Sequence, residues 1–384
     1  MSVRVAVAPD LLQWAVERAG WDDETIDKRA PKLDAWAAGQ EPTLKQLEKF
    51  ARDTHTPLGL FFLPEPPEEK VPIPDMRTLN NAGVNRPSAD MLDVIYICQE
   101  RQYWYCGYVV DHGLVPPSFI GSATLDDPPA LIANHIRNLL DFDVADRAAF
   151  SNWEDSLRRL IDRIEAIDVL VMVSRIVGSN TRRVLNPQEF RGFALADPIA
   201  PLIFVNGADT KAAQIFTLIH EVAHIWLGES ALSDASMKAR LGQEAELWCN
   251  RVAAEVLIPQ TPLRRDYSGE PTINELERLA SRYRVSTLVV LKQLATARLI
   301  SWDNFEDSYD QELNRITTIL SERRQRPSGG NYYYSQPLRL SRQFARAVVS
   351  STFEGSTGYR DAYRLLGTKK HETFQNLAAE LGVA

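Results

Sequence analysis

The segment 210–228, TKAAQIFTLIHEVAHIWLG, constrains this chain more than any other because it specifies both a helix and a chemistry. Apolar residues recur in it at steps of three and four, and Gly228 can end it, which predicts an α-helix. Within that helix, His220 and His224 stand four residues apart, so both imidazoles project from one face and can bind one cation. Glu221 is turned by about 100° from His220 and is a candidate general base beside such a cation. Apolar residues on both sides disfavour the alternative, a solvated helix that carries two histidines by chance.

A metal site of this type needs a third protein ligand and leaves the fourth position to water. The next helical run, residues 244–258, ends at a proline and offers three carboxylates. Glu246 shares a helical face with Asn250 and is otherwise surrounded there by small or apolar residues, which favours it as the third ligand. Glu244 and Glu255 are the competing carboxylates, and both fit solvated or structural positions better.

The letters HEVAHIWLG, followed by E-x-x-C-N-x-x-A-A-E-x-L-I-P, resemble the two motifs of the ImmA/IrrE family of metallopeptidases. The letters RGFAL that precede them fit the same family. The resemblance implies a zincin-like α+β domain in which His220, His224 and Glu246 hold Zn²⁺. It also implies an HExxH-type zinc endopeptidase with Glu221 as catalytic base, and it gives Asn250 the role of bracing a ligand.

The overall composition limits the other kinds of site and partner. With 384 residues, 45% apolar and 24% charged, the chain has the composition of a globular protein and room for two or three domains. No run reaches about 18 apolar residues and no signal pattern opens the chain, so we expect a cytoplasmic protein without a membrane partner. Three scattered cysteines without a CxxC pair disfavour a disulfide framework and thiolate zinc. The net charge of −8 gives no overall attraction to nucleic acid.

Residues 1–63 predict a compact helical unit that resembles the helix-turn-helix of Cro/C1-type (XRE) regulators. The resemblance rests on LDAWAAGQEPTLKQL at 33–47, but the usual alanine-and-glycine turn is missing and Pro31 shortens the presumed reading helix. Lys28, Arg29 and Lys32 lie near that helix and are the candidate DNA contacts.

The charge of this N-terminal unit speaks against DNA as a partner. Residues 1–65 hold eight Lys and Arg against eleven Asp and Glu. A module that neutralises several phosphates is rarely acidic. Direct DNA binding and a docking or dimerising role are therefore both left open.

These observations predict a mainly α protein with a small β-sheet. The expected parts are a helix-turn-helix-like domain at 1–63, a proline-rich linker at 64–85, a zincin-like metallopeptidase domain at 86–262 and a C-terminal helical domain at 263–384. Strands are expected at 168–174, 189–195 and 200–206. The sheet they form can be a structural meander or offer an edge to an extended peptide. An arginine- and tyrosine-rich stretch at 323–346 fits either a solvated loop or a contact with an acidic partner.

Two functions fit this arrangement. The first is a zinc-dependent endopeptidase that cleaves a specific protein, and the resemblance implies a repressor-like transcriptional regulator as its substrate. The alternative is a DNA-binding transcriptional regulator or antitoxin of a toxin–antitoxin module, which binds a cognate toxin and carries a mainly structural metal site. Glu221 disfavours the alternative in part, because a structural site does not need a general base. A neighbouring repressor gene would favour proteolysis, whereas a neighbouring small nuclease gene would favour the antitoxin.

Overall fold

The computed structural model describes residues 3–74, 87–147, 150–233, 244–323 and 339–383. The chain divides into two compact units, one comprising Met1–Pro72 with Asn81–Tyr96 and the other comprising Ile73–Asn80 with Ile97–Ala384. Most described residues are helical and one small mixed sheet is present, which confirms the predicted mainly α class with a small sheet. Among the described residues, no helix combines the length and the apolarity that crossing a membrane requires.

The first unit is a small helical domain around an aromatic core. Its helical segments are α1 (Pro9–Arg18), α2 (Asp23–Arg29), α3 (Leu33–Ala37), α4 (Leu44–Asp53) and the 3-10 helix η1 (Leu58–Phe62). Local signals fix α4, because Thr43 and Gln46 form a reciprocal capping box at its start. Phe50 lies at the centre of the core, where its ring contacts those of Trp36 and Phe61. The helices follow the sequence pattern, and the helix-turn-helix identity of this unit stays a prediction.

The second unit is built on a sheet of order β1-β5-β4-β6, in which β1 and β5 are parallel and the other pairs are antiparallel. The strands are β1 (Leu170–Ser174), β4 (Gly192–Leu195), β5 (Leu202–Asn206) and β6 (Ala231–Ser233), and a separate hairpin joins β2 (Ile176–Val177) to β3 (Asn180–Val184). The three predicted strands correspond to β1, β4 and β5. The hairpin and β6 were not predicted, because strands of two or three residues carry too little periodicity to detect.

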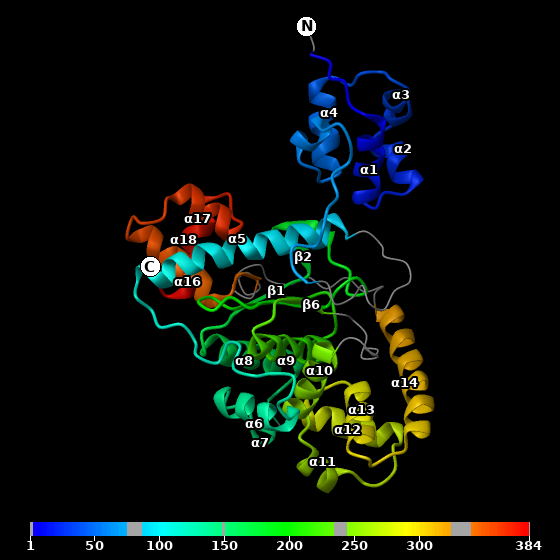
Figure 1. Cartoon of the computed structure of the whole chain (residues 1–384), viewed down its shortest axis with the longest axis vertical. Helices are drawn as coiled ribbons and strands as arrows, with labels where there is room; N and C mark the ends of the chain where they lie inside the picture. Colours follow the sequence, from blue (N-terminus) through cyan, green and yellow to red (C-terminus); the bar gives the residue numbers. More distant parts are fainter. Residues whose placement is uncertain (1–2, 75–86, 148–149, 234–243, 324–338, 384) are drawn as a thin grey trace. The chain divides into compact units, whose positions relative to one another are not determined.

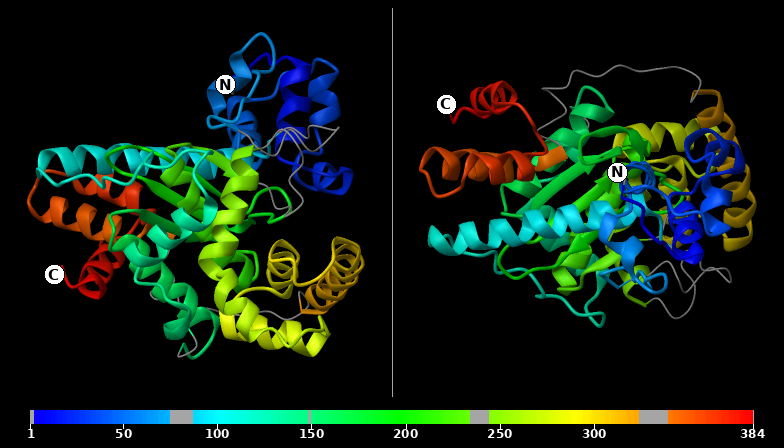
Figure 2. Two further views of the ribbon diagram at one scale, coloured as in Figure 1. Left: turned by 60° about the horizontal axis from the view of Figure 1, so that its bottom comes forward. Right: turned by 90° about the horizontal axis from the view of Figure 1, so that it is seen from above.

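Helices cover both faces of this sheet (Figure 1). On one face, Val171 and Ile203 belong to the core that includes α8 (Trp153–Glu165), α9 (Lys211–Leu227) and α10 (Glu244–Leu257). Neighbouring strand residues point to the other face, where Arg101 of α5 (Ala89–Asp111) contacts the Met172 sulfur at 3.6 Å. This alternation is the pattern expected of strands that are buried on both sides. Figure 2 shows the same layers from two further directions.

The remaining helices surround these layers. They are α6 (Pro129–Leu139), α7 (Val144–Arg147), α11 (Gln260–Asp266), α12 (Ile273–Tyr283), α13 (Thr287–Thr296), α14 (Trp302–Arg323), α16 (Arg342–Phe353), α17 (Tyr359–Leu366) and α18 (His371–Leu381). Leu276, Tyr283 and Leu291, beyond residue 263, share one hydrophobic core with Trp226 of α9 and Val252 of α10.

The packing therefore differs from the expected domains at 86–262 and 263–384. One continuous core leaves no division near residue 262, and the second unit begins again at Ile97 within α5 rather than at 86. The expected linker at 64–85 lies within the described residues only up to Pro74. The arginine- and tyrosine-rich stretch lies outside them at 324–338.

Candidate metal centre

Helix α9 carries the two histidines and is fixed at both ends by local interactions. The Thr210 side chain accepts a hydrogen bond from the Ala213 amide, and Gly228 ends the helix in the left-handed conformation with φ 71°. A Cβ atom on Gly228 would also lie 2.9 Å from the Gly121 Cα, so only glycine fits this position. Side chains on every face of the helix are buried from Gln214 to Trp226. The helix is therefore an internal element, which agrees with the apolar residues that flank both histidines.

Helix α10 brings Glu246 to the histidines. It packs against α9, and buried residues of both helices, such as Ile219 of α9 and Val252 of α10, belong to one hydrophobic core. The Arg147 guanidinium, itself fully buried, donates to the carbonyls of Leu257 (2.7 Å) and Tyr283 (3.2 Å) and so holds the C-terminal end of α10. Glu246 lies in the first turn of the helix, where the helix dipole favours a negative charge.

Three side chains converge at the junction of these helices. His220 Nε2 and His224 Nε2 lie 3.2 Å apart, and the two carboxylate oxygens of Glu246 lie 3.3 and 3.1 Å from them. A tetrahedral zinc ion with bonds of about 2.0–2.1 Å separates its ligand atoms by roughly 3.3 Å. The two imidazoles and the carboxylate therefore fit three corners of a zinc tetrahedron, in both donor type and spacing. Among the described residues, they are the one group of histidine, cysteine and acidic side chains so arranged.

Burial shifts the pKa values of the ionisable side chains in this cluster. His220, His224 and Glu246 are all buried, with relative exposures of 4%, 0% and 2%. Burial opposes ionisation of Glu246, yet the two imidazoles hold the pKa of its carboxyl well below the ordinary value. Burial also acts to lower the pKa of His220, but the Glu246 carboxylate outweighs it and raises that pKa, whereas burial lowers the pKa of His224. A divalent cation is the partner that such a buried carboxylate and two imidazoles suit best.

Glu221 is fully buried on the side of α9 that faces β4. A Cβ atom on Gly192 of β4 would lie 3.1 Å from Glu221 Oε1, so the strand approaches this carboxylate as closely as a glycine allows. The charge of Glu221 contributes to raising the pKa of His220, which places the two side chains in one electrostatic environment. The importance of Gly192 was not recognised from the sequence, although a glycine inside a strand is a sign of close approach.

The other carboxylates of α10 lie away from the cluster or have structural partners. Glu244 is exposed. Glu255 accepts hydrogen bonds from the Gln260 amide (3.2 Å) and from the Gln293 side chain (2.9 Å), at the far end of the helix. Among the three acids that the sequence offered, the structure therefore brings only Glu246 to the histidines. Asn250 is buried one turn after Glu246, and its side chain contributes to raising the pKa of His220.

The outer edge of the sheet beside α9 is partly occupied. The backbone amide of Leu232 in β6 donates to the carbonyl oxygen of Pro74 at 3.1 Å, and Ile73 is buried. A peptide that paired with β6 at this residue would take the place of Pro74. The substrate edge stays a prediction.

The remaining predicted residues lie in the first unit. Arg29 and Lys32 line a cavity there together with Lys49, whereas Lys28 does not. Their role as DNA contacts stays a prediction.

Comparison with known proteins supports a metallopeptidase domain. Residues 164–295 match a family model described as the IrrE N-terminal-like domain, and residues 340–380 match a domain of unknown function. The chain is 36% identical over 104 residues to the radiation response metalloprotease IrrE of Deinococcus radiodurans, which covers 26% of this chain and 32% of that protein. The matched part of this chain thus spans about a third of the relative. These likenesses support a metalloprotease-type domain at residues 164–295, which contain α9, α10 and all four strands of the sheet.

Proposed function

We propose that this protein is a zinc-dependent endopeptidase that cleaves a specific protein partner. The observation that carries the proposal is the convergence of His220, His224 and Glu246 at 3.1–3.3 Å, with Glu221 on the same helix. The similarity to a metalloprotease over 104 residues supports the reaction class. A repressor-like regulator is the substrate that we propose, because a protease attached to a regulator-like helical unit is suited to one target rather than to general digestion.

Each residue of the centre has a distinct task in this proposal. His220, His224 and Glu246 would hold a zinc ion, which supplies Lewis acidity at the scissile carbonyl and acidifies the attacking water. Glu221 takes a proton from that water as the water attacks, and then passes it to the leaving amide nitrogen. Asn250 keeps the imidazole of His220 in its orientation. Burial of all these groups strengthens their electrostatic interactions, because little water remains to screen them.

The test separates metal binding from catalysis. Purified full-length protein is analysed for zinc by mass spectrometry and is then incubated with the regulators encoded beside its gene. Glu221→Gln should retain zinc and lose cleavage by a factor of about 10² or more, because only the proton transfer is removed. His224→Ala should lose both. A Glu221→Gln variant that still cleaves at the wild-type rate would show that another group is the base.

A further inference from the structure

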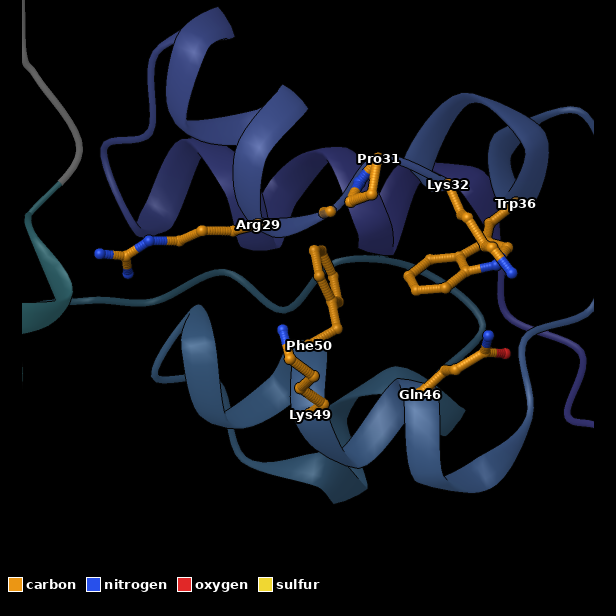
Figure 3. A pocket seen from close by; sticks show the side chains of 8 residues that line it. Arg29, Pro31, Lys32, Trp36, Gln46, Lys49 and Phe50 are labelled. Carbon is orange, nitrogen blue, oxygen red and sulfur yellow. The ribbon is translucent and has the colours of Figure 1, made fainter.

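A cavity of about 180 Å³ opens on the first unit, between the α2–α3 connection and α4 (Figure 3). Such a volume is many times what one water molecule needs, so it can admit a large side chain. Its lining combines apolar and cationic residues: Arg29, Ala30, Pro31, Lys32, Trp36, Gln46, Lys49 and Phe50. All of them belong to this unit.

The cavity exists because the chain between α2 and α3 is unusual. Helix α2 ends at Arg29, Pro31 cannot continue it, and α3 then spans only five residues from Leu33. The cavity lies beside this connection, and its lining includes Trp36 and Phe50, whose rings meet edge to face with centroids 5.8 Å apart.

The charged groups that line the cavity, Arg29, Lys32 and Lys49, are all cationic hydrogen-bond donors. Lys32 and Arg29 are exposed and form no ion pair with another described residue, and the Arg29 guanidinium lies over the Trp21 ring with 5.7 Å to its centroid. Lys49 is also exposed and pairs with Asp53 at 2.8 Å. The Gln46 side-chain oxygen already accepts from Thr43 in the capping box, which leaves its NH₂ group for a ligand. A ligand that complements this rim must therefore supply acceptors and negative charge.

The aromatic floor of the cavity, formed by Trp36 and Phe50, disfavours nucleic acid as the ligand. Phe50 and Trp36 line the cavity and are only 3% and 7% exposed, so a group reaches them only by entering the cavity, which suits one side chain better than a run of stacked bases. The cationic groups are confined to the rim, because residues 1–65 as a whole carry a net charge of −3, so a short acidic segment suits this surface better than a long phosphate backbone. A concave site with an apolar floor suits a single side chain that enters it, flanked by carboxylates that reach the rim.

We propose that this cavity is the docking site for an acidic peptide segment of a protein partner, with one large apolar side chain seated on Trp36 and Phe50. The flanking carboxylates of the segment pair with Lys32 and Arg29, and one of them replaces Asp53 on Lys49. The proposal is independent of the metal centre, and it gives the first unit a task in selecting partners.

The test measures binding of defined peptides to the full-length protein by fluorescence anisotropy, at an ionic strength of about 0.15 M. The main probe is a labelled peptide with one phenylalanine flanked on each side by four aspartates. Two control probes replace either the phenylalanine by alanine or the aspartates by asparagine. We expect the main probe to bind about tenfold more tightly than either control, because it alone satisfies both floor and rim.

Charge reversal locates the site. Lys32→Glu should weaken binding of the main probe about fivefold or more, because it replaces an attractive rim charge by a repulsive one. Lys45→Glu is the matched control, since Lys45 lies exposed on α4 with the same change in net charge but does not line the cavity. It should change binding by less than about twofold. Both substitutions are at exposed positions, so the fold of the unit is preserved.

Four results would overturn the proposal. The first is no binding of the main probe, and the second is equal binding of the alanine control. The third is an equal effect of Lys32→Glu and Lys45→Glu, which would mean general charge attraction. The last is tighter binding of a duplex of about 20 base pairs that Lys32→Glu abolishes, which would make this surface a nucleic-acid contact.

Discussion

Replacing Gly192 by alanine tests whether β4 holds Glu221 in place. The new Cβ atom would lie 2.7 Å from the Thr217 Cγ2 atom, 2.8 Å from the carbonyl oxygen of Phe204 and 3.1 Å from Glu221 Oε1. The first two distances are shorter than van der Waals contact allows. Phe204 belongs to the paired strand β5, so rotation of a side chain cannot relieve that contact. The strand must move, and the Thr217 and Glu221 side chains must move with it.

The magnitude follows from overpacking in a buried site, which typically costs about 1–3 kcal/mol. For a unit of this size, a loss of about 2 kcal/mol lowers the melting temperature by roughly 3 °C. None of the three contacts involves His220, His224 or Glu246, so zinc content should not change. A displaced Glu221 carboxylate should reduce cleavage by about tenfold or more, because proton transfer depends steeply on geometry.

The assay compares thermal unfolding, zinc content and cleavage rate in the wild type, Gly192→Ala and Gly107→Ala. Gly107 is the matched control, because it lies within α5 and a Cβ atom there meets nothing within 4 Å. Alanine at a helical glycine of this kind should raise stability by about 0.5–1 kcal/mol and leave cleavage unchanged. If Gly192→Ala unfolds and cleaves like the wild type, the close approach of β4 does not position Glu221.

Three further substitutions test other parts of the second unit. Arg147→Ala should lower the free energy of unfolding by about 3–5 kcal/mol in chemical denaturation, because it leaves buried carbonyls without donors and creates a cavity. A decrease of less than about 1 kcal/mol would contradict this expectation. Asn250→Ala should weaken zinc affinity by about 10–100-fold in chelator competition, because the proposed function gives Asn250 the role of orienting His220. Glu275→Gln tests a pH dependence. A hydrogen bond from Arg278 lowers the pKa of Glu275 to about 2. The carboxylate therefore stabilises the fold above pH 4.5, and this contribution is lost as the pH falls toward 2. The substitution should cost about 1–2 kcal/mol at pH 7, a value reduced for the exposure of Arg278, and almost nothing near pH 2, as denaturation at both pH values would show.

Much of the secondary structure was predictable because its signals are local. The segment predicted as a helix at 210–228 forms α9 over Lys211–Leu227, with the predicted glycine at its end. Strands β1, β4 and β5 lie within the predicted segments for the same reason, since their apolar runs and turn residues are contained in the sequence around them. The spacing of the two histidines on one helical turn likewise needs no tertiary contact to be read.

The choice of the third ligand needed more than spacing. Three carboxylates stand on α10, and periodicity alone favoured one of them without excluding the others. The packing of α10 against α9 brings Glu246 to the imidazoles, while Glu255 is engaged by α13 and Glu244 remains exposed. The packing of helices from both sides of residue 262 into one core was hidden for a related reason, because sequence composition does not reveal which helices share one core.

By itself, the sequence determined the helix that carries the two histidines, its general base candidate, the composition of the partner helix and the helical character of both ends of the chain. These features depend on contacts between residues a few positions apart, which a linear pattern records. Only the tertiary structure decided that Arg147 is buried against carbonyls 110 and 136 residues later, that Gly192 lies against Glu221, and that a cationic cavity opens above Phe50. Such features arise where distant segments pack together, and the sequence around each residue contains no trace of the partner that it will meet.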